Sequence, residues 1–235
     1  MSSEVSKKTV ITCGGCGEKG HNRMSKACLK NPKVDRSKAN VTEILMKKDK
    51  SADELNYLRK YFTAVVEADK AARERQVKIG EEFGKTPRSH GLSQEASQGI
   101  VMSTYHYQLN DMTCRQPKSG DLISDIDGKV ECKAITCTND APGSCGSTQG
   151  WETMILLDAT GFLEDRYRVM RLCIPDTDKR WDEFKRAKKN KDNKLVRPRL
   201  NWKKILAKFG DEFKVIYEGS FEGIFVKGEP TLGTP

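Results

Sequence analysis

The sequence predicts a mixed α+β domain. Three observations support this: a long stretch with helical periodicity, a middle region of short apolar segments typical of strands, and alternating helical and strand-like segments after it. The chain has 235 residues, enough for one substantial domain and a small appended module. We expect a cysteine-rich module over 1–30, a basic linker over 31–50 and the main domain over 51–235.

The helices of the first half are predicted from capping residues and apolar spacing. Ser51 and Glu54 fit a capping box, in which each side chain satisfies a free backbone amide of the first turn. Apolar residues then recur every three or four positions, so a long helix is expected over 52–82. A short helix around 41–47 in the linker and a second long helix over 92–108 are also expected.

Beyond residue 120 the apolar pattern changes to that of strands. Segments 121–125 and 129–136 are predicted to form a hairpin, because Asp127-Gly128 is a strong turn signal between them. Later strands are expected over 153–158, 167–174, 213–217 and 223–226, and basic helices over 178–190 and 201–209.

Positive charge is concentrated in two blocks. The net charge is +9, yet residues 1–50 carry 12 Lys and Arg against 5 Asp and Glu, and residues 179–208 carry 13 against 3. This distribution is typical of a protein that binds a polyanion such as DNA. The expected phosphate contacts in the second block are Lys185, Arg186, Lys188, Lys189, Arg197, Arg199, Lys203 and Lys204. Asn139 and Gln149, in a polar loop over 136–150, are candidate readers of base edges, because side-chain amides pair with adenine.

No membrane association or export is expected. No run approaches the ~18 apolar residues of a membrane span. The first residues lack the apolar stretch of a secretory signal. We therefore expect an intracellular protein, in the cytoplasm or with the DNA, whose eight cysteines are not paired as disulfides.

Cys13, Cys16, His21 and Cys28 are candidate ligands of one structural zinc ion. Zinc prefers four nitrogen or sulfur ligands in a tetrahedron, and a CxxC turn directs two thiolates to one point. The segment resembles the zinc knuckle of nucleic-acid-binding proteins, with the pattern C-x2-C-x4-H-x4-C. It departs from that pattern at Cys28, which six residues rather than four separate from His21.

Asp121, Glu131 and Lys133 carry the predicted chemistry. Two carboxylates hold a hard cation such as Mg²⁺, and a nearby lysine can orient water and offset charge on a phosphate. This arrangement resembles the PD-(D/E)xK nuclease superfamily, which includes most type II restriction endonucleases. Gly120 stands where the family has a proline. The resemblance implies that Asp121, Glu131 and the carbonyl of Cys132 bind the metal. It also makes Glu95 on the preceding helix a candidate for the site, gives a catalytic core over 90–175, and suggests a homodimer. The fold it implies is a restriction-endonuclease-like central mixed sheet flanked by helices.

The length of the hairpin loop decides whether this site can form. A two-residue loop would place Asp121 on the face opposite Glu131 and Lys133. A three-residue loop over 126–128 would pair Asp121 with Lys133 and place all three side chains on one face. We therefore predict a loop of odd length, or a compensating bulge, with a positive φ at Gly128.

The sequence leaves three functions open. The first is a sequence-specific endonuclease of double-stranded DNA, which the polar loop favours. The second is a structure-specific or repair nuclease of the same superfamily. The third is a non-catalytic nucleic-acid-binding protein that acts through its zinc knuckle.

Overall fold

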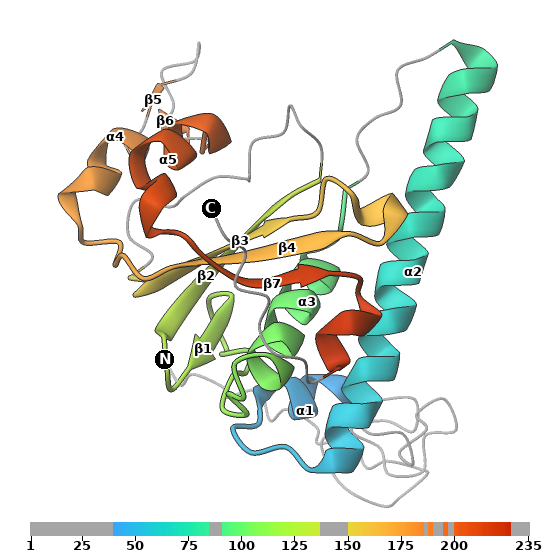
Figure 1. Cartoon of the computed structure of the whole chain (residues 1–235), viewed down its shortest axis with the longest axis horizontal. Coiled ribbons are helices and arrows are strands. Elements are labelled where there is room, and N and C mark those ends of the chain that lie inside the picture. The colour runs from blue at the N-terminus through green and yellow to red at the C-terminus, as the bar shows by residue number, and fades with distance from the viewer. Residues whose placement is uncertain are drawn as a thin grey trace, which may run out of the picture. The chain divides into compact units, whose positions relative to one another are not determined.

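A computed structural model describes residues 40–84, 91–136, 150–185, 188–189, 195–196 and 200–226. From Val41 onward the chain forms one compact unit (Figure 1). No helix within these ranges is long and apolar enough to cross a membrane.

The centre of this unit is a five-stranded mixed sheet in the order β1-β2-β3-β4-β7. Its strands are β1 (Leu122–Ser124), β2 (Gly128–Ile135), β3 (Thr153–Asp158), β4 (Tyr167–Leu172) and β7 (Lys214–Gly219). Strands β2 and β3 are parallel, and all other neighbours are antiparallel. Two further strands, β5 (Lys188–Lys189) and β6 (Leu195–Val196), pair with each other. The predicted mixed sheet is thus confirmed.

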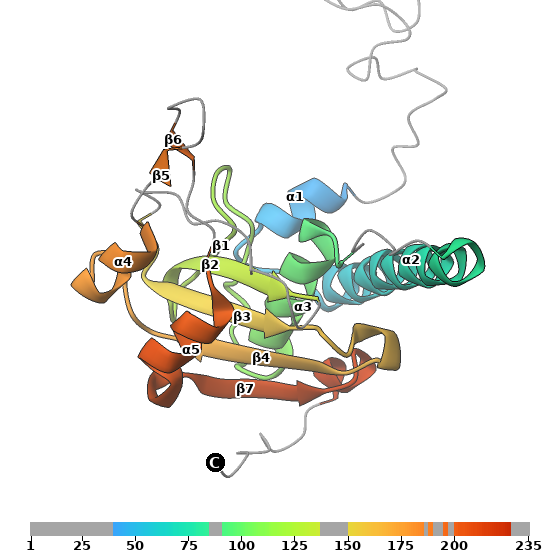
Figure 2. The ribbon, with the colours of Figure 1, turned by 90° about the horizontal axis from the view of Figure 1, so that it is seen from above.

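Helices cover both faces of the sheet (Figure 2). On one face lie α1 (Val41–Met46), α2 (Ala52–Phe83), α3 (Gln94–Tyr107) and the 3-10 helices η1 (Phe162–Glu164) and η4 (Glu222–Phe225). On the other lie η2 (Lys179–Trp181), α4 (Asp182–Lys185) and α5 (Trp202–Phe209), which η3 (Gly210–Glu212) follows. Each face has its own buried apolar cluster, so the sheet is the shared middle layer.

The two long helices form where the sequence predicts them. The Ser51 hydroxyl accepts a hydrogen bond from the Glu54 amide at 3.2 Å, and the Glu54 carboxylate accepts one from the Ser51 amide at 3.0 Å, so the capping box is present. Where α2 and α3 pack together, a Cβ at position 99 would lie 2.2 Å from the ring of Phe62. Gly99 therefore lets the two helices approach closely.

Three local predictions differ from the structure. The helix expected over 178–190 ends at Lys185 and strand β5 begins at Lys188, because after Trp181 and Phe184 no apolar residue larger than Ala187 follows until Leu195. The strand expected over 223–226 is the 3-10 helix η4, which the Ser220 hydroxyl caps by accepting from the Gly223 amide at 3.1 Å. The predicted linker also ends earlier than residue 50: Ile44 and Leu45 of α1 are buried in the main core.

The hairpin has an odd-length loop, as predicted, but in a different register. Leu122 pairs with Val130 and Ser124 with Gly128, so the loop is residues 125–127 rather than 126–128. Gly128 has a φ of 62°, which confirms the predicted left-handed conformation. The loop closes one residue earlier because the Ser124 hydroxyl accepts hydrogen bonds from the amides of Ile126 and Asp127.

The last residue of this loop is anchored by its buried carboxylate. Asp127, with a side chain only 2% exposed, forms an ion pair with Arg171 of β4, whose Nε donates at 3.0 Å. The hydroxyl of Tyr105 on α3 also donates to Asp127. The loop is therefore tied to both the sheet and a helix.

Loss of the cation from this buried pair should destabilise the protein strongly. Arg171→Met leaves the Asp127 charge buried without its partner, so the free energy of unfolding should fall by about 3 kcal/mol. Arg168→Met on the same strand is the matched control: Arg168 pairs with Glu218 at the surface, and its loss should cost below about 1 kcal/mol. Equal losses in urea denaturation would contradict the anchoring role of Asp127.

Candidate active site

Asp121 directly precedes β1, and hydrogen bonds to both of its oxygens hold its carboxylate in place. Oδ1 accepts from Nε2 of Gln98 on α3 at 2.9 Å, and Oδ2 accepts from the amide of Cys132 on β2 at 2.9 Å. Gln98 is itself oriented by Gln116, whose Nε2 donates to its Oε1 at 3.0 Å. A chain of two amides thus sets the direction of Asp121.

Asp121 directly precedes the paired residues of β1, and its carboxylate lies beside the backbone of β2. Glu131 and Lys133 are two residues apart and share a face of β2, and the Lys133 ammonium donates to Glu131. Asp121 and Glu131 line the same cleft, and the charge of Asp121 acts on Glu131. The structure therefore brings Asp121, Glu131 and Lys133 together, although the observed register does not pair Asp121 with Lys133 as predicted.

The electrostatics at Glu131 are those of a crowded acidic site. Burial raises the pKa of its carboxyl, and the neighbouring charges of Asp121 and Asp176 raise it further. Lys133 acts in the opposite direction, through its charge and its hydrogen bond. The negative charge of ionised Glu131 is thus only partly balanced by the positive charge of Lys133.

The two carboxylates open into one cleft of about 310 Å³. Its floor and walls come from the hairpin, from the segment that leads into β1, and from the residue before β3. The lining residues are Pro117, Ser119, Gly120, Asp121, Leu122, Ile123, Lys129, Val130, Glu131 and Trp151.

The donor set of this cleft fits a magnesium ion. Mg²⁺ retains several waters and is commonly bound by one or two carboxylates. Within the described ranges no group of three or more His, Cys, Asp and Glu side chains could hold a metal ion. A cation in this cleft would have Asp121 and Glu131 as its carboxylate ligands. The amide of Cys132 points toward Asp121. The N–H and C=O of one strand residue point to the same side, so its carbonyl faces that edge as well.

Glu95 is placed differently from the prediction. Its carboxylate accepts a hydrogen bond from Tyr61 of α2. Gln98, one helical turn later, is the α3 residue that contacts Asp121. The structure thus connects α3 with Asp121 through Gln98, whereas Glu95 contacts α2.

Two residues near the site were not singled out from the sequence. Gln98 lies on the face of α3 that packs toward the hairpin, three residues after Glu95, and this spacing is the signal that could have identified it. Asp176 follows Pro175 after the end of β4. Its Oδ2 accepts from the amide of Gly150 at 2.8 Å. No sequence pattern connects Asp176 with the hairpin.

The other predicted site residues are only partly within the described ranges. Lys203 and Lys204 are exposed on α5. Lys185 ends α4, and Lys188 and Lys189 form β5, but only their backbone is described. The predicted zinc ligands Cys13, Cys16, His21 and Cys28 lie outside the described residues, as do Asn139, Gln149, Arg186, Arg197 and Arg199.

Comparison with known proteins identifies no relative. The chain matches no protein-family model, no curated protein and no solved structure with which it was compared.

The contact between Gln98 and Asp121 should determine metal affinity. Gln98→Leu removes the donor that orients the carboxylate, and loss of such a supporting hydrogen bond typically weakens metal binding by about 10- to 100-fold. Titration of Mn²⁺, followed by the electron paramagnetic resonance signal of the free ion, measures this. Glu95→Gln, on the same helix, should leave the affinity unchanged. The reverse ranking would show that Glu95 rather than Gln98 supports the site.

Metal binding should also depend on pH through Glu131. Only the ionised carboxylate binds a cation, and the pKa of Glu131 is raised in the folded protein. As the pH is lowered, the metal affinity should therefore begin to fall at a higher pH than it would for an ordinary glutamate. Lys133→Met removes the charge that lowers this pKa, so the midpoint of Mn²⁺ binding should move to higher pH. Lys129→Met, an exposed lysine of the same cleft, is the control. A midpoint that stays in place in the Lys133 variant would contradict the assignment.

Proposed function

We propose that this protein is a Mg²⁺-dependent endonuclease that hydrolyses phosphodiester bonds of double-stranded DNA at specific sequences. The observation that carries the proposal is the placement of Asp121 and Glu131 in one cleft, with Lys133 against Glu131. A resemblance in sequence to the PD-(D/E)xK superfamily supports the same activity.

Each residue of the candidate site has a separate role in the proposed reaction. Asp121 and Glu131 would hold the ion, with the carbonyl of Cys132 beside them. Bound there, Mg²⁺ would polarise the scissile phosphate and acidify a bound water. Gln98 and the Cys132 amide keep Asp121 oriented, so the site needs little rearrangement to bind. Lys133 holds its proton at Nζ, close to Glu131, where it can orient a water and offset the charge that develops on phosphorus.

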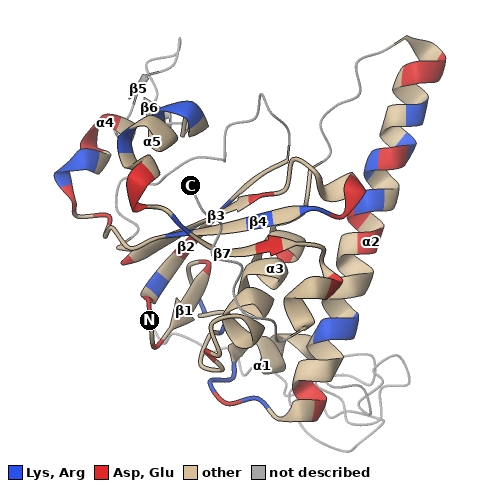
Figure 3. Ribbon diagram, in the orientation of Figure 1, with Lys and Arg blue, Asp and Glu red and all other residues tan. Residues whose placement is uncertain are grey.

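Exposed lysines on α5 also support a DNA substrate. Lys203 and Lys204 are exposed on α5, where Figure 3 shows basic residues, and the helix lies on the same side of the sheet as Glu131 and Lys133. Basic residues of this kind would contact phosphates and set the register of the duplex. The predicted zinc knuckle would add affinity, and the loop over 136–150 would read bases. A homodimer would cut both strands symmetrically.

A cleavage assay with matched variants tests the proposal. Supercoiled plasmid incubated with protein and Mg²⁺ should give discrete fragments. Asp121→Asn, Glu131→Gln and Lys133→Met should each reduce the rate at least about 100-fold while DNA binding persists. Lys60→Met, at an exposed lysine of α2 outside the cleft, should cut normally. Full activity in any of the three variants would remove that residue from the site.

The same assay separates the competing functions. Cleavage of branched DNA without discrete plasmid fragments would identify a structure-specific nuclease. A shift in gel mobility with no cleavage of either substrate would identify a non-catalytic binding protein.

A further inference from the structure

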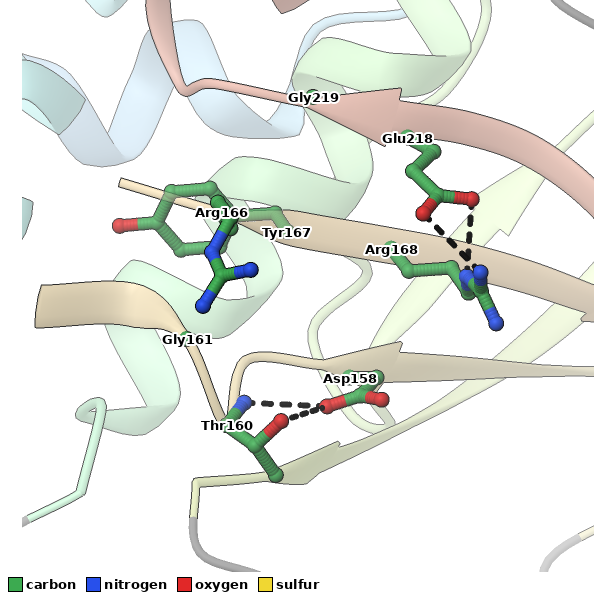
Figure 4. Close-up of a pocket in the computed structure, with 8 residues that line it drawn as sticks. All are labelled: Asp158, Thr160, Gly161, Arg166, Tyr167, Arg168, Glu218 and Gly219. Atoms are coloured by element: carbon green, nitrogen blue, oxygen red, sulfur yellow. Dashed lines mark hydrogen bonds and ion pairs between the residues drawn. The ribbon is translucent and has the colours of Figure 1, made fainter. Parts of the chain in front are cut away.

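The long helix α2 extends beyond the sheet that it helps to cover (Figure 1). Lys70 ties the middle of the helix to the domain: its ammonium pairs with Asp165 at 2.6 Å and lies over the ring of Tyr167, which Figure 4 shows. Beyond Lys70 the helix continues over residues 71–83, or about 20 Å at ~1.5 Å per residue. We call these residues the outer segment of α2.

A mostly apolar stripe runs along α2 and continues onto the outer segment. Its positions follow alternating steps of four and three residues, which keep side chains on one face of a helix. They are Leu58, Phe62, Val65, Asp69, Ala72, Gln76, Ile79 and Phe83. Leu58 and Phe62 are buried in the main core, whereas Ile79 and Phe83 are 48% and 64% exposed. The face that holds α2 on the domain thus continues where solvent reaches it.

The charges beside the stripe match an antiparallel copy of the same segment. Arg75 and Glu82 are seven residues apart and flank the stripe at equivalent positions. In an antiparallel, two-fold pair, Arg75 of each copy lies opposite Glu82 of the other. In a parallel pair, Arg75 would instead face the uncharged Gly80. Both charged side chains are exposed, and neither forms an ion pair within the part of the chain that the structure describes.

The antiparallel arrangement also suits the sizes of the side chains and the position of the domain. It places Phe83 of one copy beside Ala72 of the other, and Ile79 beside Gln76, so the largest side chain meets the smallest. Lys70 of one copy then lies level with a point just beyond Phe83 of the other. The packed half of each α2 therefore begins where the other helix ends, and the two domains lie at opposite ends of the contact.

We propose that the outer segment of α2 binds the outer segment of a second copy in antiparallel orientation, forming a two-fold symmetric dimer. The contact covers only about four turns of helix, so the dimer dissociates on dilution. The inference rests on the proposed function only for the purpose of the dimer, which is to present two clefts to two DNA strands. The contact itself follows from α2.

Sedimentation velocity of the full-length protein without DNA, over a wide range of concentrations, tests the contact. Arg75→Glu places like charges opposite each other twice, so it should raise the dissociation constant at least about 10-fold, and Glu82→Arg should do the same. The double variant Arg75→Glu/Glu82→Arg restores opposite charges and should bind nearly as the wild type does. Circular dichroism checks that each variant keeps its helix content.

A second pair of variants tests the apolar stripe. Ile79→Asn removes an apolar side chain from both halves of the contact and should weaken the dimer at least about 10-fold. Val226→Asn is the matched control, because Val226 is an apolar residue of the surface that is as exposed as Phe83, at 64%. It should leave the dissociation constant unchanged.

Each outcome decides the proposal. Weakening by both single charge variants, with recovery in the double variant, supports the contact. A monomer at every concentration overturns it, and so does a dimer that the double variant fails to restore or that Ile79→Asn leaves unchanged. A wild type that cuts DNA as a monomer would overturn the contact and leave the nuclease function standing. A dimer that passes the charge test but cuts no DNA would do the reverse.

Discussion

The candidate active site depends on the burial of one carboxylate in a hairpin loop. Asp127 is held by Arg171 from the sheet and by Tyr105 from α3, and this fixes the loop at three residues. Loop length sets the parity of the two strands, and parity decides which side chains share a face. A loop one residue shorter would reverse which residues of β2 face the apolar core. The anchor therefore connects the stability of the fold with the geometry of the cleft.

The predictable parts of the fold are those with a local physical cause. The capping box of Ser51 and Glu54, the periodic apolar residues behind it and the turn signal at Gly128 each act within a few residues, and each feature is present in the structure. The register of the hairpin was not predictable from the turn alone. It depends on Ser124, which bonds the loop amides, and on Arg171, which lies 44 residues beyond Asp127. The short apolar segment ending at Val226 fits a strand or a turn of helix equally well, and Ser220 decides between them.

The candidate site likewise contains residues that are near one another in the sequence and residues that are distant. Its central residues come from one hairpin, so their nearness follows from a short stretch of the sequence. The supporting residues come from elsewhere: Gln98 from a helix and Asp176 from the end of another strand. Such contacts depend on tertiary packing, for which a single sequence carries little signal. The site also opposes stability, because burial and two neighbouring acids raise the pKa of Glu131, so its ionisation at neutral pH favours the unfolded chain. Lys133 offsets part of this cost.

The backbone of Cys132 supports Asp121, while its side chain packs on the other face of β2, against the apolar core. Burial raises the pKa of this thiol well above the ordinary range, and the same holds for the fully buried Cys114. Both thiols therefore stay protonated at neutral pH, which makes them poor nucleophiles. Among the cysteines of the described ranges, Cys173 alone is exposed. A maleimide dye attached there would report on β4 without touching the catalytic hairpin.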